Sequence, residues 1–118
     1  MDRKLYCYRA TIISVYDGDT VRADIDLGLK TWVKNEKLRL ARINAPELRG
    51  DEREAGLAAR DFLRDKILEH DVIIETLKDK KGKYGRYLVE IWLEQEGEES
   101  INVNDLMVEA GHADYHDY

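Results

Sequence analysis

The strongest constraint on the fold is a short stretch of alternating hydrophobicity near the N-terminus. Over residues 20–27 an apolar side chain occupies every second position, and Thr, Arg and Asp occupy the positions between. A period of two residues indicates a strand with one face against a core and the other in solvent. Turn sequences bound the stretch, Asp17-Gly18-Asp19 before it and Leu27-Gly28-Leu29 after it. The pattern predicts successive strands joined by short turns.

The rest of the chain supplies further strands and two helices. β-branched and aromatic residues predict a strand over Tyr6–Val15, and a third strand is expected from about Thr31 to Ile43, closed by Pro46. Apolar residues at helical spacing predict a helix over 55–67. Later segments are predicted as a strand over Val72–Leu77, a polar loop over Lys78–Gly85, a strand over 87–93, and a helix over Val103–Ala110 capped by Asn102.

The order of these segments defines the expected fold class. Three strands, a helix, two strands and a second helix predict a mainly β chain with helices, in the α+β class. Five short strands around one core suit an OB-type Greek-key barrel with two or three helices, the first of which plugs one end. An open mixed α+β sheet fits the same order. At 118 residues the chain has room for one core, so residues 1–118 are interpreted as a single domain.

Composition narrows the cellular setting. Cys7 is the only cysteine, which excludes an internal disulfide and favours a reducing compartment. The start of the sequence leads into no long apolar run, so we expect a cytoplasmic protein with no signal peptide and no membrane contact. Three histidines and one cysteine, widely spaced, match no zinc-site pattern. A monomer is assumed.

The charge distribution is more informative than the net charge of −6, which by itself disfavours bulk attraction to nucleic acid. Five basic residues and only one acidic residue occur in each of two segments, residues 30–42 and 78–86. Residues 90–118 contain nine acidic side chains and no Lys or Arg. Two basic segments could form one surface if the fold brings them together, although ordinary solvated turns would show the same composition.

Three short motifs carry chemical information. Asp17-Gly18-Asp19-Thr20 places two carboxylates around a tight turn, which suits a hard cation, although such turns are mostly simple hairpins. The segment 39–47 begins with Arg39, a guanidinium among apolar neighbours, and ends in Asn-Ala-Pro-Glu. The third motif is Lys83-Tyr84-Gly85-Arg86, and by itself it is also consistent with a turn glycine flanked by solvated charged residues. Each motif is unspecific by itself.

In this order, with a helix between the second and third, the motifs resemble the staphylococcal nuclease family. The resemblance runs from about Tyr8 to Gly111, including the order of strands and helices. It implies an OB-type barrel and calcium-dependent hydrolysis of phosphodiester bonds in DNA and RNA. The expected partner is therefore a DNA or RNA substrate, and the expected cofactor is Ca²⁺.

The resemblance also implies roles for individual residues. Arg39 and Arg86 correspond to the pair that clamps the scissile phosphate, and Glu47 to the carboxylate that positions or deprotonates the attacking water. Two planar guanidiniums suit a phosphodiester, because they hydrogen-bond several phosphoryl oxygens at once. The remaining positions correspond to metal-site and nucleotide-binding residues: Asp19, Asn44, the carbonyl of Ala45 and Asp17 for the metal, and Lys83, Tyr84 and Tyr115 for the nucleotide.

One position departs from the family pattern. Asn44 stands where the family has a second metal-binding carboxylate, so the site loses one negative charge, and ligand charge sets Ca²⁺ affinity. A noncatalytic nucleic-acid-binding or protein-binding module is therefore the alternative function. Retention of Arg39, Glu47 and Arg86 favours the enzyme. His112, Asp114 and His116 could gather a metal at the C-terminus, but a solvated tail explains them as well.

Overall fold

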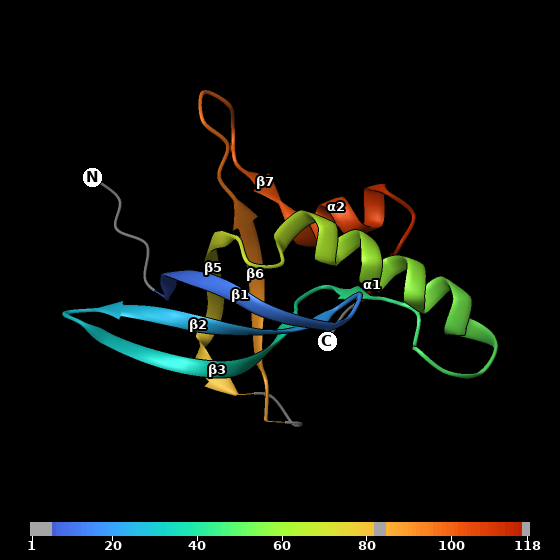
Figure 1. The fold of residues 1–118 in the computed structure, drawn as a ribbon, viewed down its shortest axis with the longest axis horizontal. Helices are drawn as coiled ribbons and strands as arrows, with labels where there is room; N and C mark the ends of the chain where they lie inside the picture. The colour runs from blue at the N-terminus through green and yellow to red at the C-terminus, as the bar shows by residue number, and fades with distance from the viewer. Residues whose placement is uncertain (1–5, 82–84, 117–118) are drawn as a thin grey trace.

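A computed structural model describes residues 6–81 and 85–116 of the chain (Figure 1). Most of the elements are strands, and two α-helices lie between them. The elements are β1 (Cys7–Asp17), β2 (Thr20–Gly28), β3 (Thr31–Leu40), β4 (Ile43–Asn44), η1 (Gly50–Glu52), α1 (Arg53–Ile67), β5 (Asp71–Lys81), β6 (Tyr87–Leu93), β7 (Ile101–Asn102), α2 (Val103–Glu109) and β8 (Asp114–Tyr115).

Five of the strands close into a barrel. The sheet runs in the order β3-β2-β1-β5-β6-β7, and β3 also pairs with β6. This closing pair is parallel and places Leu38 opposite Tyr87 and Arg39 opposite Leu88. The expected OB-type barrel is therefore confirmed, and the open sheet is not formed. Closure also joins β3 to the start of β6. Two described residues of the second basic segment lie close by, because the Lys81 ammonium pairs with Glu36 of β3 and Arg86 donates to Thr20 of β2.

The barrel interior and the first helix share one core. The inward residues of β2 (Val21, Ala23 and Ile25) are almost completely buried, as the alternating pattern predicts. α1 adds Ala59, Leu63 and Ile67 to the same cluster. The alternation and the helical stripe thus bury their apolar faces against each other.

Several boundaries differ from the prediction. β1 extends to Asp17, two residues past its expected end, α1 begins at Arg53, and two larger differences follow. β3 ends at Leu40, and Arg42 turns the chain with a φ of 66° before the two-residue strand β4. β5 continues to Lys81, where a polar loop was expected from Lys78, because Lys81 pairs with Tyr87 and its ammonium lies 3.0 Å from the Glu36 carboxylate. The polar composition of β5 concealed this pairing, since exposed strand ends carry lysine readily.

The C-terminal elements fold back onto the turn after β3. Asn102 caps α2 by accepting a hydrogen bond from the backbone N–H of Asp105 (2.9 Å), as predicted. β8 pairs antiparallel with β4, with Ile43 opposite Tyr115 and Asn44 opposite Asp114. Neither helix has the length and apolar character that a bilayer crossing requires, over the residues that the structure describes.

Candidate active site

Two glycines bring the three chain segments of the candidate site into contact. A side chain at Gly18 would put its Cβ 2.7 Å from Cβ of Ala45 and 2.8 Å from Cβ of Ala59, so only glycine lets the Asp-Gly-Asp turn lie against the turn after β4 and against α1. Gly56 allows α1 to approach the Pro46–Glu47 backbone equally closely. A glycine inside a helix costs about 1 kcal/mol relative to alanine, and this close approach explains its presence.

Asp19, Arg39 and Asn44 form a compact polar cluster beneath these contacts. The Asp19 carboxylate accepts the backbone N–H of Ala45 at 2.9 Å and lies 3.3 Å from the Arg39 guanidinium. Arg39 also donates to Oδ1 of Asn44 at 3.3 Å and to the carbonyl of Leu40 at 2.7 Å. The Asp19 and Arg39 side chains are only 9% and 7% exposed. Three predicted site residues therefore meet here, and the guanidinium lies between the two expected metal ligands.

Asp17 and Glu47 line a second part of the site. They share a polar pocket of about 310 Å³ with Tyr16, Leu48 and Arg49. The Asp17 carboxylate accepts the backbone N–H of Asp19 at 3.1 Å, which shapes the turn. Burial, and then the nearby charge of Asp19, raises the pKa of Asp17 from 3.8 to about 6.

The Glu47 side chain is 61% exposed, and its carboxylate pairs with Arg49 at 3.2 Å. Its charge is therefore solvated and reachable from the pocket that it shares with Asp17. The pairing with Arg49 was not expected from the sequence.

Arg86 joins the cluster from the start of β6. Its guanidinium donates to Oγ1 of Thr20 at 3.4 Å, and Thr20 pairs with Arg39 across β2 and β3. Both predicted phosphate-binding arginines therefore lie near the same strand pair. The predicted nucleotide-binding residues Lys83 and Tyr84 lie outside the described residues.

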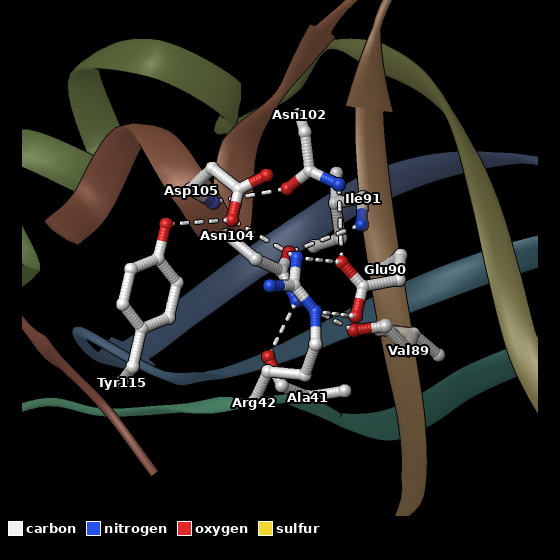
Figure 2. Close-up of polar contacts among 9 residues, drawn as sticks. All are labelled: Ala41, Arg42, Val89, Glu90, Ile91, Asn102, Asn104, Asp105 and Tyr115. Carbon is white, nitrogen blue, oxygen red and sulfur yellow. Dashed lines mark hydrogen bonds and ion pairs between the residues drawn. The ribbon is translucent and has the colours of Figure 1, made fainter. Parts of the chain in front are cut away.

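Arg42 forms ion pairs with acidic residues of β6 and α2 rather than with the Asp19–Arg39–Asn44 cluster (Figure 2). Its guanidinium makes two hydrogen bonds to Glu90, at 2.8 and 2.6 Å, and approaches the Asp105 carboxylate at 3.0 Å. The hydrogen bonds to Glu90 are the largest cause of a raised Arg42 pKa. Arg42, one of the five basic residues in the segment 30–42, is thus neutralised by two acidic residues of the C-terminal quarter.

Tyr115, predicted to contact nucleotide, belongs to this network. Its hydroxyl donates to Asp105 at 2.9 Å, and the Arg42 guanidinium carbon lies 5.9 Å from its ring centroid. The hydrogen bond to Asp105 is the largest cause of a raised Tyr115 pKa. Because Tyr115 lies opposite Ile43, its backbone is adjacent to Asn44, while the side chain remains 56% exposed.

One buried residue that the sequence did not single out supports this region. Asn104 is fully buried and donates to the carbonyls of Ala41 and Val89, both at 2.9 Å, while it accepts the N–H of Ile91 at 3.1 Å. It ties α2 to β6 and to the turn before β4 (Figure 2). An asparagine among apolar helix positions was the available signal, because a buried amide must find partners.

The candidate metal ligands are oxygen atoms, which suit a hard cation, but together they carry little negative charge. Asp19, Asn44 and the Ala45 carbonyl offer oxygen ligands, which Ca²⁺ prefers. Arg39 already contacts both the Asp19 carboxylate and the Asn44 amide oxygen. Across residues 6–81 and 85–116, no three His, Cys, Asp or Glu side chains are grouped so that they could hold a metal ion, and the His112 ring packs against Phe62.

The closed barrel, with its carboxylate turn and two arginines at one edge, defines a small OB-type domain. A family model described as staphylococcal nuclease homologue matches residues 37–118. The chain is 32% identical over 88 residues to the thermonuclease of Staphylococcus hyicus, an alignment that covers 72% of this chain and 48% of the relative. For the thermonuclease of Staphylococcus intermedius the identity is 33% over 92 residues, 75% of this chain and 49% of the relative.

The chain therefore belongs to the staphylococcal nuclease homologue family. It spans about half the length of the curated relatives that it matches. The matched residues 37–118 include Arg39, Asn44, Glu47 and Arg86, whereas the Asp17–Thr20 turn lies before them.

Proposed function

We propose that this chain is a metal-dependent nuclease that hydrolyses phosphodiester bonds in DNA or RNA. The observation that carries the proposal is the convergence of three motifs, distant in sequence, on one edge of the barrel. The turn at Asp19, the end of β3 at Arg39 and Arg86, which directly precedes β6, are linked through Thr20 and the Asp19–Arg39 ion pair. The thermonuclease relatives support the same reaction class.

Each side chain has a definite task in this proposal. Arg86 and Arg39 bind phosphoryl oxygens, where negative charge grows during attack, and guanidiniums stabilise such charge at fixed positions. Glu47 takes the proton of the attacking water, because its carboxylate opens into the pocket that it shares with Asp17. Asp19, Asn44 and the Ala45 carbonyl would hold Ca²⁺, with Asp17 nearby, and the ion would neutralise phosphate charge and orient the substrate.

Arg39 must change partners when substrate binds. Without substrate its guanidinium contacts the Asp19 carboxylate and the Asn44 amide. A phosphate is a stronger acceptor than a neutral amide, because its hydrogen bonds are charge-assisted. We therefore expect the bond to Asn44 to be exchanged for a bond to the phosphate, which frees the Asn44 oxygen for the cation.

The alternative function is a noncatalytic binding module on the same barrel. It is favoured by one specific observation, the replacement of an expected carboxylate by Asn44, whose oxygen is bound to Arg39. Such a module would bind nucleic acid without hydrolysing it, with or without Ca²⁺.

Glu47→Gln separates the two functions, because it preserves size and removes the base. The enzyme predicts that single-stranded DNA or RNA is cleaved in Ca²⁺ and not in chelator, and that Glu47→Gln abolishes cleavage while an anisotropy titration shows unchanged binding. Arg86→Ala should lower turnover by about 10²–10⁴-fold. Glu54→Gln is the matched control, since it makes the same chemical change at an exposed position in the first turn of α1 and removes no proposed base. Binding without cleavage under all these conditions would establish the noncatalytic module.

A further inference from the structure

The outer face of strands β1, β2 and β3 leads away from the candidate site in register. The row at the site is Asp17, Thr20 and Arg39, and the next row along the strands is Ser14, Arg22 and Lys37. Residues directly opposite in a sheet point to the same face. Arg22 and Lys37 therefore continue the face that carries Arg39.

Within the described part of the chain, these two cations have no acidic partner. Arg22 donates to the backbone carbonyl of Asn35 at 3.0 Å, and neither Arg22 nor Lys37 has a carboxylate within ion-pair distance among the described residues. In a chain of net charge −6, neighbouring cations without carboxylates mark a local site for an anion.

An exposed aromatic residue lies farther along the same face. Trp32 pairs with Asp26, is 45% exposed, and has the Lys34 ammonium 4.6 Å from its ring centroid. Trp32 lies seven positions before Arg39 on β3, which corresponds to roughly 23 Å of strand. Figure 1 shows that the β2–β3 hairpin carrying it extends beyond the rest of the barrel.

Three carboxylates lie on this face, Asp17 at the site and Asp24 and Asp26 along the hairpin, and each accepts a backbone N–H. Asp24 accepts the backbone N–H of Asn35 at 2.9 Å and lies 3.6 Å from the Lys34 ammonium, and Asp26 accepts the N–H of Gly28 at 2.8 Å. They shape the bulge and the turn of the hairpin. Lys34 offsets the charge of Asp24, whereas Asp26 keeps its charge opposite Trp32, so Arg22 and Lys37 supply the positive charge nearest the candidate site.

We propose that the outer face of β2 and β3, defined by Arg22, Lys37, Lys34 and Trp32, binds a single-stranded segment of nucleic acid that continues from the candidate active site. Arg22 and Lys37 contact successive phosphates, and Trp32 stacks on an unpaired base. A phosphate chain matches the uncompensated cations, and an exposed indole requires a base that is free of its partner. The length of the face suits the lower end of the range of about 4–16 nucleotides that OB folds hold.

This inference rests on the proposed function, because it assigns the path of the same substrate. The test measures binding alone, in chelator, so that it does not depend on cleavage. The probe is a fluorescently labelled oligothymidylate of roughly ten nucleotides, long enough to cross the face. Anisotropy titrations over a series of salt concentrations give both the affinity and its salt dependence.

The double variant Arg22→Ala/Lys37→Ala should reduce the slope of log affinity against log salt by about 1.4, since each single-strand phosphate contact contributes about 0.7. Trp32→Ala should weaken binding by about 5- to 150-fold, and Trp32→Phe should restore part of it. The control Arg60→Ala/Lys66→Ala removes the same charge from α1 and should leave the slope unchanged. Circular dichroism melting verifies that each variant folds.

Three results would overturn the assignment. They are an unchanged slope in the double variant, an equal change of slope in the α1 control, and tighter binding of the corresponding duplex than of the single strand. If the wild type cleaves nucleic acid while the hairpin variants bind normally, the binding face is wrong and the proposed hydrolysis stands. If the hairpin variants lose binding but the wild type never cleaves, the hydrolysis is wrong and the binding face stands.

Discussion

Gly56→Ala tests whether the close approach of α1 sets the position of Glu47. The added Cβ would overlap the Glu47 carbonyl oxygen and would lie 2.8 Å from the carbonyl carbon and 3.0 Å from the Pro46 oxygen. Carbon atoms in contact prefer about 3.5 Å or more, and the carbonyl oxygen lies closer still than the carbon, so the helix or the Glu47 backbone must shift by more than about 0.7 Å. These neighbours are backbone atoms and have no rotamer that relieves the overlap.

The expected stability change combines two opposing terms. Alanine favours the helix by up to about 1 kcal/mol relative to glycine. Overpacking in a close contact costs about 1–3 kcal/mol. We therefore expect a net loss of about 0–2 kcal/mol in the free energy of unfolding. Because a displacement near 1 Å at a catalytic group costs about 10²-fold, turnover should fall far more than stability.

The assay compares urea unfolding, kcat/KM on single-stranded DNA and the backbone amide chemical shift of Glu47. Ala58→Gly is the matched control, because Ala58 is exposed on the same helix. It should cost about 1 kcal/mol of helix propensity and leave Glu47 undisturbed. If Gly56→Ala raises stability by the full helix term and leaves both turnover and the Glu47 shift unchanged, the contact does not position Glu47.

Three further substitutions test other parts of the site. Asn44→Asp adds a carboxylate to the proposed metal site and should raise Ca²⁺ affinity by about tenfold in a calorimetric titration; equal affinity would mean that residue 44 is not a ligand. Asp17→Asn should stabilise the metal-free protein by about 1–2 kcal/mol at pH 8, because the Asp17 pKa is raised to about 6 and its charged form is disfavoured. Melting across pH should show this gain fade as pH falls from about 6 to 3.8, and a constant gain would exclude a charge effect. Asn104→Leu should destabilise by about 2–4 kcal/mol in chemical denaturation, since it leaves the Ile91 N–H buried without its acceptor, and an unchanged midpoint would refute that.

Local patterns in the sequence were sufficient for the elements themselves. The alternation in residues 20–27 needs only a two-residue period and a core on one side. It became β2, in which Val21, Ala23 and Ile25 are buried, whereas Leu27 near the strand end is 46% exposed. The cap at Asn102 depends on a hydrogen bond three residues along the chain, and it forms as predicted. The resemblance in the ordered motifs placed the chain in its family, because motif order survives where each motif alone is common.

The boundaries and partners depended on contacts between distant segments. β5 extends to Lys81 because Tyr87 and Glu36 offer partners there, which no local pattern contains. Arg42 belongs to a basic segment of the sequence, yet Glu90 and Asp105, brought close by β6 and α2, bind it (Figure 2). The sequence gives the charge of a side chain, but the tertiary packing determines which residue that side chain pairs with.

The candidate site shows the same division. The sequence determined that Asp19, Arg39, Asn44 and Arg86 are present, with donor and acceptor types suited to a phosphate and a cation. Only the tertiary structure decided that the Arg39 guanidinium lies between Asp19 and Asn44, and that Gly18 and Gly56 allow the surrounding backbone to close on them. Several of these contacts, such as that between Asp19 and Ala45, join residues tens of positions apart. Their geometry follows from barrel closure and helix packing, which side-chain chemistry along the chain does not encode locally.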